Sequence, residues 1–214
     1  MAIEIACTIM QTFTSTQIEP VAEALLSGKV AVLPTDTVYG LVAAPTHEAA
    51  VDRIFELKNR PKDFHLPIMV AKAEELQDLG LEITKHAQAL LDSEYIPGGL
   101  TLILGFKNNA PRPAWLAGRH EVAIRIPNHD FMLKLLSQTG PLLATSANRH
   151  KSKINMCILP EILEDLHSEP DLTVDGGILS GRSSTIVNCR YKELSMERRG
   201  DIRIEQIENI LMSK

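Results

Sequence analysis

Residues 29–41 read Lys-Val-Ala-Val-Leu-Pro-Thr-Asp-Thr-Val-Tyr-Gly-Leu. The apolar run Lys29–Leu33 is typical of a buried strand, and Pro34 ends it. Polar residues that follow a strand of an α/β sheet are commonly placed at the ligand crevice. Segment 35–39 supplies three hydroxyls and one carboxylate, which offer dense hydrogen bonding. A plain turn is the alternative interpretation, because proline, threonine, aspartate and glycine all occur readily in turns.

Helical and strand patterns alternate along the rest of the chain. Helices are predicted at Ile18–Gly28, His47–Lys58, Glu74–Leu79, Thr84–Asp92, Phe131–Ser137, Ile158–His167 and Glu205–Met212. Further strands are predicted at Pro67–Ala71, Leu100–Phe106, Val122–Ile126, Leu142–Thr145, Leu172–Val174, Thr185–Asn188 and Ile202–Ile204. This alternation implies an α/β fold built on a mixed sheet.

The composition is that of an ordinary globular protein, with 44% apolar and 23% charged residues in a chain of 214. This length fits one domain, predicted to span residues 1–214. Lysine and arginine number 22 against 27 aspartates and glutamates, which gives a net charge of -5. A protein that binds nucleic acid over a broad face is more often basic, so the charge favours a pocket for a small anion.

The three cysteines, Cys7, Cys157 and Cys189, lie far apart and form no CxxC motif. Such a sparse, odd count argues against a disulfide framework and against a cysteine-rich zinc site. The seven histidines show no paired metal-ligand spacing, so no protein-bound metal is predicted. The sequence shows no signal-peptide pattern and no apolar stretch approaching 18 residues, so we expect a cytoplasmic protein without a membrane span.

Lys58 and Arg60 stand at the end of the helix predicted from His47. Two cations at a helix C-terminus can simply interact with the helix dipole and the last carbonyls, and in isolation this is the simpler interpretation. The functional alternative is a phosphate clamp. Lysine supplies a compact charge, and arginine supplies a planar fork that fits a phosphate or a carboxylate.

A second polar cluster follows the strand predicted at Leu142–Thr145. Ser146 and Asn148 could donate hydrogen bonds to phosphate oxygens or to a ribose, although a helix cap or an Asx turn uses the same residues. The basic run Arg149–Lys153 is either a solvated loop or an extension of an anion site.

Residues 176–183 nearly fit the P-loop pattern, with Arg182 at the lysine position. A P-loop opens a helix, whereas residues Thr185–Asn188 are predicted to form a strand, so we reject a P-loop here. A Gly-x-Ser-x-Gly nucleophile motif and a GxGxxG motif are both absent from the sequence.

Taken in order, these segments resemble the YrdC/TsaC family over roughly residues 18–204. The motifs that carry the resemblance are Pro34–Leu41, Lys58-x-Arg60-Pro61, Pro97–Leu102, Val122–Pro127, Ser146–Asn148, Ser184–Val187 and Arg198–Gly200. The resemblance implies a twisted open α/β sheet with flanking helices and a concave basic cavity. Longer members of the family carry an extra C-terminal domain, which we do not expect in this chain.

The resemblance also implies an activity, that of a nucleotidyltransferase. The substrates would be ATP with magnesium, L-threonine and bicarbonate, and the products threonylcarbamoyl-AMP and pyrophosphate. Threonylcarbamoyl-AMP would then serve the t6A modification of position 37 in tRNA, with the tRNA and a t6A transferase complex as partners.

Site residues follow from the resemblance position by position. Lys58 and Arg60 are the expected catalytic residues at the ATP phosphates. The full ATP-binding set would be Lys58, Arg60, Ser146, Asn148 and Arg198. The threonine-binding set would be Thr37, Arg125, Ala144 and Ser184.

The sequence departs from the family pattern at several of these motifs. Met69 stands where many members carry a threonine-binding histidine, and His65 could substitute for it. Glu121 replaces a frequent threonine, and Arg199 replaces the usual proline. Three alternatives therefore stay open: a paralogue of altered activity like the YciO branch, a module that binds double-stranded RNA by its phosphates, and a carbamoyl-transfer enzyme.

Overall fold

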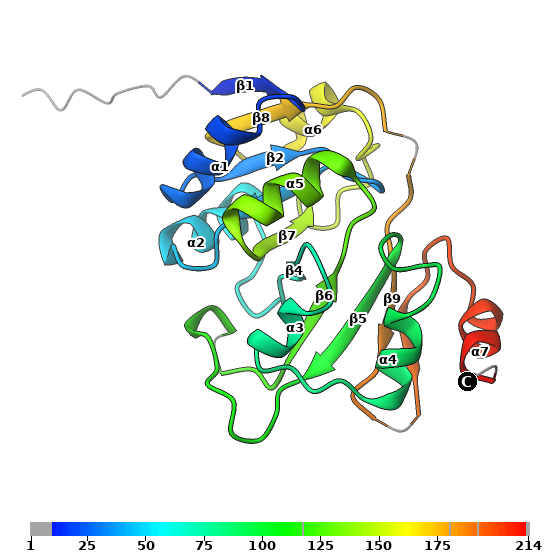
Figure 1. Cartoon of the computed structure of the whole chain (residues 1–214). Helices are drawn as coiled ribbons and strands as arrows, with labels where there is room; N and C mark the ends of the chain where they lie inside the picture. Colours follow the sequence, from blue (N-terminus) through cyan, green and yellow to red (C-terminus); the bar gives the residue numbers. More distant parts are fainter. Residues whose placement is uncertain (1–9, 117, 180, 192, 213–214) are drawn as a thin grey trace, which may run out of the picture.

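The computed structural model describes residues 10–116, 118–179, 181–191 and 193–212. These residues form one ten-stranded sheet in the order β1-β8-β2-β3-β7-β4-β6-β5-β9-β10 (Figure 1). Its strands are β1 (Gln11–Thr14), β2 (Ala31–Leu33), β3 (Gly40–Ala43), β4 (Ile68–Met69), β5 (Leu100–Gly105), β6 (Glu121–Arg125), β7 (Leu142–Ser146), β8 (Leu172–Asp175), β9 (Thr185–Asn188) and β10 (Ser195–Arg198). Cys7 lies outside the described residues.

The sheet is mixed, as the sequence predicted. β8 pairs in parallel with β1 and β2, and the pairs β4–β6 and β5–β9 are also parallel. The pairs β2–β3, β3–β7, β4–β7, β5–β6 and β9–β10 are antiparallel. The register places Gly40 opposite Ser146 and Met69 opposite Arg125, so motifs far apart in the sequence become neighbours.

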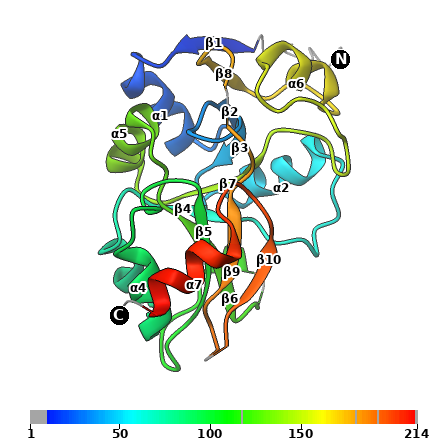
Figure 2. The ribbon, with the colours of Figure 1, turned by 90° about the vertical axis from the view of Figure 1, so that its right-hand side faces the viewer.

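The helices are α1 (Ile18–Leu26), α2 (Glu48–Leu57), α3 (Glu75–Asp78), α4 (Lys85–Leu91), α5 (Asp130–Thr139), α6 (Leu159–Asp165) and α7 (Ile204–Met212), with a 3-10 turn η1 (Ala114–Leu116). α1 and α5 lie side by side over one face of β2, β3 and β7 (Figure 1). α2 and α6 cover the opposite face of these strands. α4 and α7 pack together beside β5 and β9 (Figure 2). No helix within the described ranges is long and apolar enough to cross a lipid bilayer.

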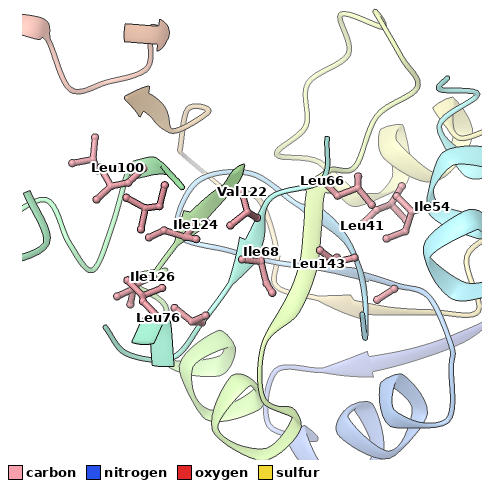
Figure 3. Packing of buried hydrophobic residues seen from close by; sticks show 14 of the residues in the cluster. Leu41, Ile54, Leu66, Ile68, Leu76, Leu100, Val122, Ile124, Ile126 and Leu143 are labelled. Atoms are coloured by element: carbon pink, nitrogen blue, oxygen red, sulfur yellow. The ribbon is translucent and has the colours of Figure 1, made fainter. Parts of the chain in front are cut away.

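The apolar core explains why β2 is a continuous hydrophobic run. Val32 packs into the cluster under α2 and α6, while Ala31 and Leu33 pack into the cluster under α1 and α5. A strand buried on both faces needs apolar side chains at every position. Figure 3 shows the larger cluster, in which Leu41 and Ile54 meet across β3 and α2.

β5 and β6 differ from β2 because only one of their faces is in the core. Leu100, Leu102 and Leu104 pack into the larger cluster, and so does Ile124 of β6. Successive side chains of a strand point to opposite faces. Thr101, Ile103 and the equivalent β6 residues therefore project from the other face of the sheet.

One predicted strand is wrong, and three strands escaped prediction. Ile202 is not in a strand, and α7 begins at Ile204. The hydroxyl of Thr185 donates to the Ile202 carbonyl at 2.9 Å and accepts from the Ile202 amide at 3.1 Å. The backbone groups of Ile202 thus bond to a side chain and not to a neighbouring strand. The short strands β1 and β10 are mostly exposed and polar, and β3 follows directly on a segment interpreted as a turn.

Candidate functional site

A cavity of about 600 Å³ lies against the face of β5, β6 and β9 that does not join the core, and Met69 of β4 borders it. Alternation along the strands supplies its floor, with Thr101 and Ile103 from β5, Ala123 from β6, and Ile186 and Asn188 from β9. The segments that follow β2 and α2, together with the end of β7, supply the other walls. The cavity therefore brings together the polar segments that follow β2 and α2 and the end of β7.

Arg125, the last residue of β6, is 5% exposed and has fixed partners at the cavity wall. Its Nη1 donates to Thr37 Oγ1 at 2.8 Å, its Nη2 pairs with Asp36 Oδ1 at 3.0 Å, and its Nε donates to the Gly98 carbonyl at 3.1 Å. Burial lowers the pKa of Arg125, while the charge of Asp36 opposes that shift. A guanidinium has five N–H donors, so two donors remain for a ligand.

Arg198, at the end of β10, brings a second guanidinium to the same wall. It donates from Nε to the Ser184 carbonyl at 3.0 Å and from Nη2 to Ser184 Oγ at 2.9 Å. Burial lowers the pKa of Arg198, and the charge of Arg125 lowers it further. In the described part of the chain the carboxylate of Asp36 pairs with Arg125 and none pairs with Arg198, so this wall carries excess positive charge that suits an anion.

Arg60 forms a separate cationic point in the cavity. Its Nη1 donates to Thr145 Oγ1 at 3.1 Å and its Nη2 to the His65 carbonyl at 3.2 Å. The guanidinium carbon lies 4.8 Å from the centre of the Phe64 ring, which favours a fixed orientation. Its buried Nε has no hydrogen-bond partner among the described residues. A guanidinium has five N–H donors, so Nη1 and Nη2 each keep one further donor for a ligand.

Lys58 and Asn148 do not line the cavity. Lys58 is 2% exposed and lies behind the turn that follows β7. Its Nζ donates to the carbonyl of Ser146, to the carbonyl of Asn148 at 2.5 Å and to Asn148 Oδ1 at 3.3 Å. The roles implied for these two residues at ATP stay predictions, and the geometry gives no direct access to the cavity in this conformation.

The remaining predicted site residues all line the cavity: Thr37, Arg60, Arg125, Ala144, Ser146, Ser184 and Arg198. Lining residues that the sequence analysis did not assign to the site include Thr35, Tyr39, Thr101, Thr145 and Asn188. The signal that could have found one of them is the sequence of β5, where Thr101 interrupts an otherwise apolar strand.

The cavity is of mixed charge rather than uniformly basic. Three carboxylates also line it, those of Asp63, Glu121 and Glu197. Glu121 forms an ion pair with Arg190, and Glu197 accepts from Ser195 Oγ at 2.7 Å. Within the described ranges no three His, Cys, Asp or Glu residues stand close enough to hold a metal ion.

Glycine allows one wall of the cavity to be built from two closely packed backbones. Gly181 lies so near the backbone of Thr37 that a Cβ at position 181 would collide with it. Gly176 similarly faces the ring of Pro34.

Thr185 begins strand β9 and not a helix, which confirms the rejection of a P-loop.

Residues 23–200 match a family of sequences named Sua5/YciO/YrdC and described as "Telomere recombination". The chain belongs to the Sua5/YciO/YrdC family. It is 36% identical over 197 residues to the threonylcarbamoyl-AMP synthase of Bacillus subtilis, an alignment that covers 91% of this chain and 56% of that protein. The chain thus spans little more than half the length of this curated relative.

Two solved structures in this Sua5/YciO/YrdC family have the same fold. Pyrococcus abyssi Sua5, solved in complex with L-threonine, is 33% identical with a TM-score of 0.83, covering 95% of this chain and 61% of that one. E. coli YciO is 23% identical with a TM-score of 0.80, covering 93% of this chain and 100% of that one. The YciO likeness supports the fold alone.

Met69, His65 and Glu121, where the sequence departs from the Sua5/YciO/YrdC family pattern, all line the cavity. Met69 is 7% exposed and stands beside Arg125 in the parallel register of β4 and β6. His65 also lines the cavity, and burial together with the charges of Arg119 and Arg60 lowers its pKa. Its substitution for the missing family histidine stays a prediction.

Lys58 should make the stability of this family member depend on pH. Burial is the main cause that lowers the pKa of Lys58 to about 7, and Arg60 adds to it while Asp165 opposes it. His150 also lies within the field of Lys58. An unfolded lysine keeps its proton to about pH 10.4, so the unfolded chain binds more protons between the two values. The free energy of unfolding should then rise with pH by up to about 1.4 kcal/mol per unit.

The measurement compares wild type with Lys58→Met by denaturant unfolding between pH 6 and 9. We expect the wild-type advantage to grow as the pH rises through 7. Lys62→Met is the matched control, because Lys62 has an exposed side chain paired with Asp52. A difference between wild type and Lys58→Met that stays constant over this range would show that Lys58 does not titrate there.

Proposed function

We propose that this chain forms threonylcarbamoyl-AMP and pyrophosphate from ATP, L-threonine and bicarbonate, as an enzyme of the nucleotidyltransferase type. The observation that carries the proposal is that one cavity holds positive charge at two separate places. Arg125 and Arg198 lie at the first, and Arg60, oriented by Thr145, lies at the second. Two anionic substrates that react with each other require such an arrangement. The likeness to the Bacillus and Pyrococcus proteins supports the same reaction.

The two groups suit different parts of the reaction. The free donors of Arg125 suit the planar carboxylate of threonine, with the hydroxyls of Thr37 and Ser184 nearby. The donors that remain on Nη1 and Nη2 of Arg60 suit the phosphates of ATP, and Ser146 lines the same cavity with its hydroxyl donating to Asn148 Oδ1. Arg198 lies between the hydroxyl of Ser184 and the open cavity, where it can meet the nucleotide.

The chemistry begins when the threonine amine attacks the carbon of bicarbonate, forming a carbamate and releasing water. A carbamate oxygen then attacks the α-phosphorus of ATP, and the bond to pyrophosphate breaks. No covalent link to the protein is needed, so catalysis rests on positioning and on neutralising the charge of the phosphates. ATP would bring a magnesium ion, which one or two protein carboxylates suffice to hold. Asp63 would be such a carboxylate, because it lines the cavity close enough to Arg60 for its charge to oppose the lowering of the Arg60 pKa by burial.

The wider setting of the reaction is proposed as well. Threonylcarbamoyl-AMP would pass to a transferase complex for t6A modification of tRNA, and a cytoplasmic location agrees with that use. We propose residues 1–214 as one Sua5/YciO/YrdC-type unit.

The decisive test is the release of pyrophosphate from ATP by the purified protein. Release should require both L-threonine and bicarbonate, and mass spectrometry should find threonylcarbamoyl-AMP in the same reaction. Omitting each substrate in turn provides the controls. If sensitive detection finds no pyrophosphate with all three substrates present, the proposed reaction is wrong for this chain.

Met69 favours a second candidate, a paralogue that runs the same reaction on another amino acid. Met69 stands opposite Arg125 in the strand register and lines the cavity, where its side chain offers an apolar contact in place of a polar one. Such a wall would accept an apolar side chain. Pyrophosphate release that is indifferent to threonine but rises with an apolar amino acid would support this candidate over the first.

A further inference from the structure

The turn that follows β7 is held from its buried side by the ammonium of Lys58. An ammonium group has three N–H donors and no acceptor. The acceptors around Lys58 Nζ are also three: the carbonyl oxygens of Ser146 and Asn148, and Asn148 Oδ1. The carbonyl of Lys58 in turn accepts from the His150 amide at 2.8 Å. In its protonated form Lys58 therefore has no donor left for a ligand while this turn is intact.

Asp165, at the end of α6, holds the same segment from another side. Its Oδ2 accepts from the Arg149 amide at 2.6 Å, and its Oδ1 accepts from Ser152 Oγ at 2.7 Å. Asp165 is 8% exposed and does not line the cavity. Asn148 closes the segment internally, because its Nδ2 donates to the carbonyls of Arg149 and Ser152.

The segment held in this way carries two groups that do face the cavity. Ser146 lines the cavity directly. Thr145, one residue earlier, accepts the hydrogen bond that orients Arg60. A movement of the turn would therefore displace both Ser146 and the partner of Arg60.

We propose that Lys58 and Asp165 are positioning residues, which together hold segment 146–152 in the shape that presents Thr145 and Ser146 to the nucleotide. Lys58 acts on the phosphates through this segment and not by contact with them. The part of the proposal that concerns the nucleotide rests on the proposed function. The part that concerns the shape of the segment does not.

Hydrogen exchange of the backbone amides tests the shape of the segment without any ligand. Lys58→Met and Asp165→Asn should each speed exchange in residues 146–152 by about 10-fold or more, since each removes hydrogen bonds to a charged group. The matched controls are Lys62→Met and Glu164→Gln, which change the same charges at exposed positions. Unchanged exchange in both test variants would overturn the proposal, whether or not the protein binds ATP.

A double-mutant cycle on ATP affinity tests the link to the nucleotide. Both single variants should weaken ATP binding by about 10-fold, and the double variant should be hardly weaker than either one, because both act through one segment. Full additivity of the two effects would instead assign Lys58 a phosphate contact of its own. If wild type binds no ATP at all, the proposed function fails, and hydrogen exchange still decides the proposal on the segment.

If a variant does not fold, the acylation rates of lysine amines in the wild-type protein, measured with and without ATP, provide a second test. Lys58 should react much more slowly than Lys62, and its rate should not change when ATP is added. Protection of Lys58 by ATP of about 10-fold or more would show that its amine meets the nucleotide directly, and would overturn the proposal.

Discussion

Arg125→Ala is expected to raise the KM for L-threonine by about 10- to 100-fold while the KM for ATP changes far less. The guanidinium fork fits the threonine carboxylate, and one charge-assisted hydrogen bond contributes about 1.5–3 kcal/mol. The substitution also leaves Asp36 largely buried without its ion-pair partner, with a side chain 13% exposed. Removal of one partner of a buried pair lowers the free energy of unfolding by about 3–5 kcal/mol, so the melting temperature should fall too.

Steady-state kinetics of pyrophosphate release, run below the melting temperature of the variant, give both KM values. Arg125→Lys separates the two effects, because it keeps the charge beside Asp36 but loses the fork. Arg203→Ala is the matched control, since Arg203 is exposed and does not line the cavity. A rise confined to the KM for ATP would show that Arg125 has been assigned to the wrong substrate.

Arg60→Ala is expected to weaken ATP binding and to lower turnover, each by at least about 10-fold. It removes the charge and the remaining Nη1 and Nη2 donors from the position proposed for the phosphates, and a single contact of this kind contributes about 1.5–3 kcal/mol. The circular dichroism spectrum should not change, because the hydrogen bonds of Arg60 go to Thr145 and to the loop carbonyl of His65, outside the helices. Isothermal titration with ATP measures the effect, and Arg53→Ala on α2 is the control at an exposed position.

The same variant separates the enzyme from an RNA-binding module. A face that binds RNA by many phosphates loses about one unit of salt slope for each cation removed. If Arg60 instead binds ATP, as we propose, the salt slope of RNA binding should be the same for wild type and Arg60→Ala. Unaltered ATP binding together with a shallower salt slope would favour the module.

Much of the fold could be predicted because apolar residues recur in its central helices with helical spacing and form continuous runs in its buried strands. α1, β2, α2, β5 and α5 were all placed within two residues of their observed ends. Two of the three strands that escaped prediction carry little such signal, since β1 (Gln-Thr-Phe-Thr) and β10 (Ser-Met-Glu-Arg) are short and mostly exposed. The third, β3 (Gly-Leu-Val-Ala), is buried and apolar but only four residues long. β1 pairs with β8, which is distant in the sequence, and no local pattern encodes such a pairing. β10 pairs with the preceding strand β9, but its polar sequence does not mark it as a strand.

The site shows the same limit in the case of Lys58 and Arg60. Their spacing suggested two cations acting together on one phosphate group. Asn59 between them has a φ of 46°, a left-handed conformation that asparagine tolerates and that turns the chain at the end of α2. Lys58 consequently points behind the turn after β7 while Arg60 faces the cavity. A two-residue spacing cannot reveal such a reversal, because it depends on one backbone angle.

The contact between Gly181 and Thr37 bears on how this cavity could diversify. Two main chains meet there with no room for a side chain at position 181. Substitution of that glycine therefore cannot change the shape of the pocket without moving the backbone of Thr37. The floor is different, because positions such as Ile103, Ala123 and Ile186 contribute only side chains to it. Evolution or laboratory selection for a new substrate should therefore leave the wall at Thr37 unchanged and accumulate its substitutions along the strands of the floor.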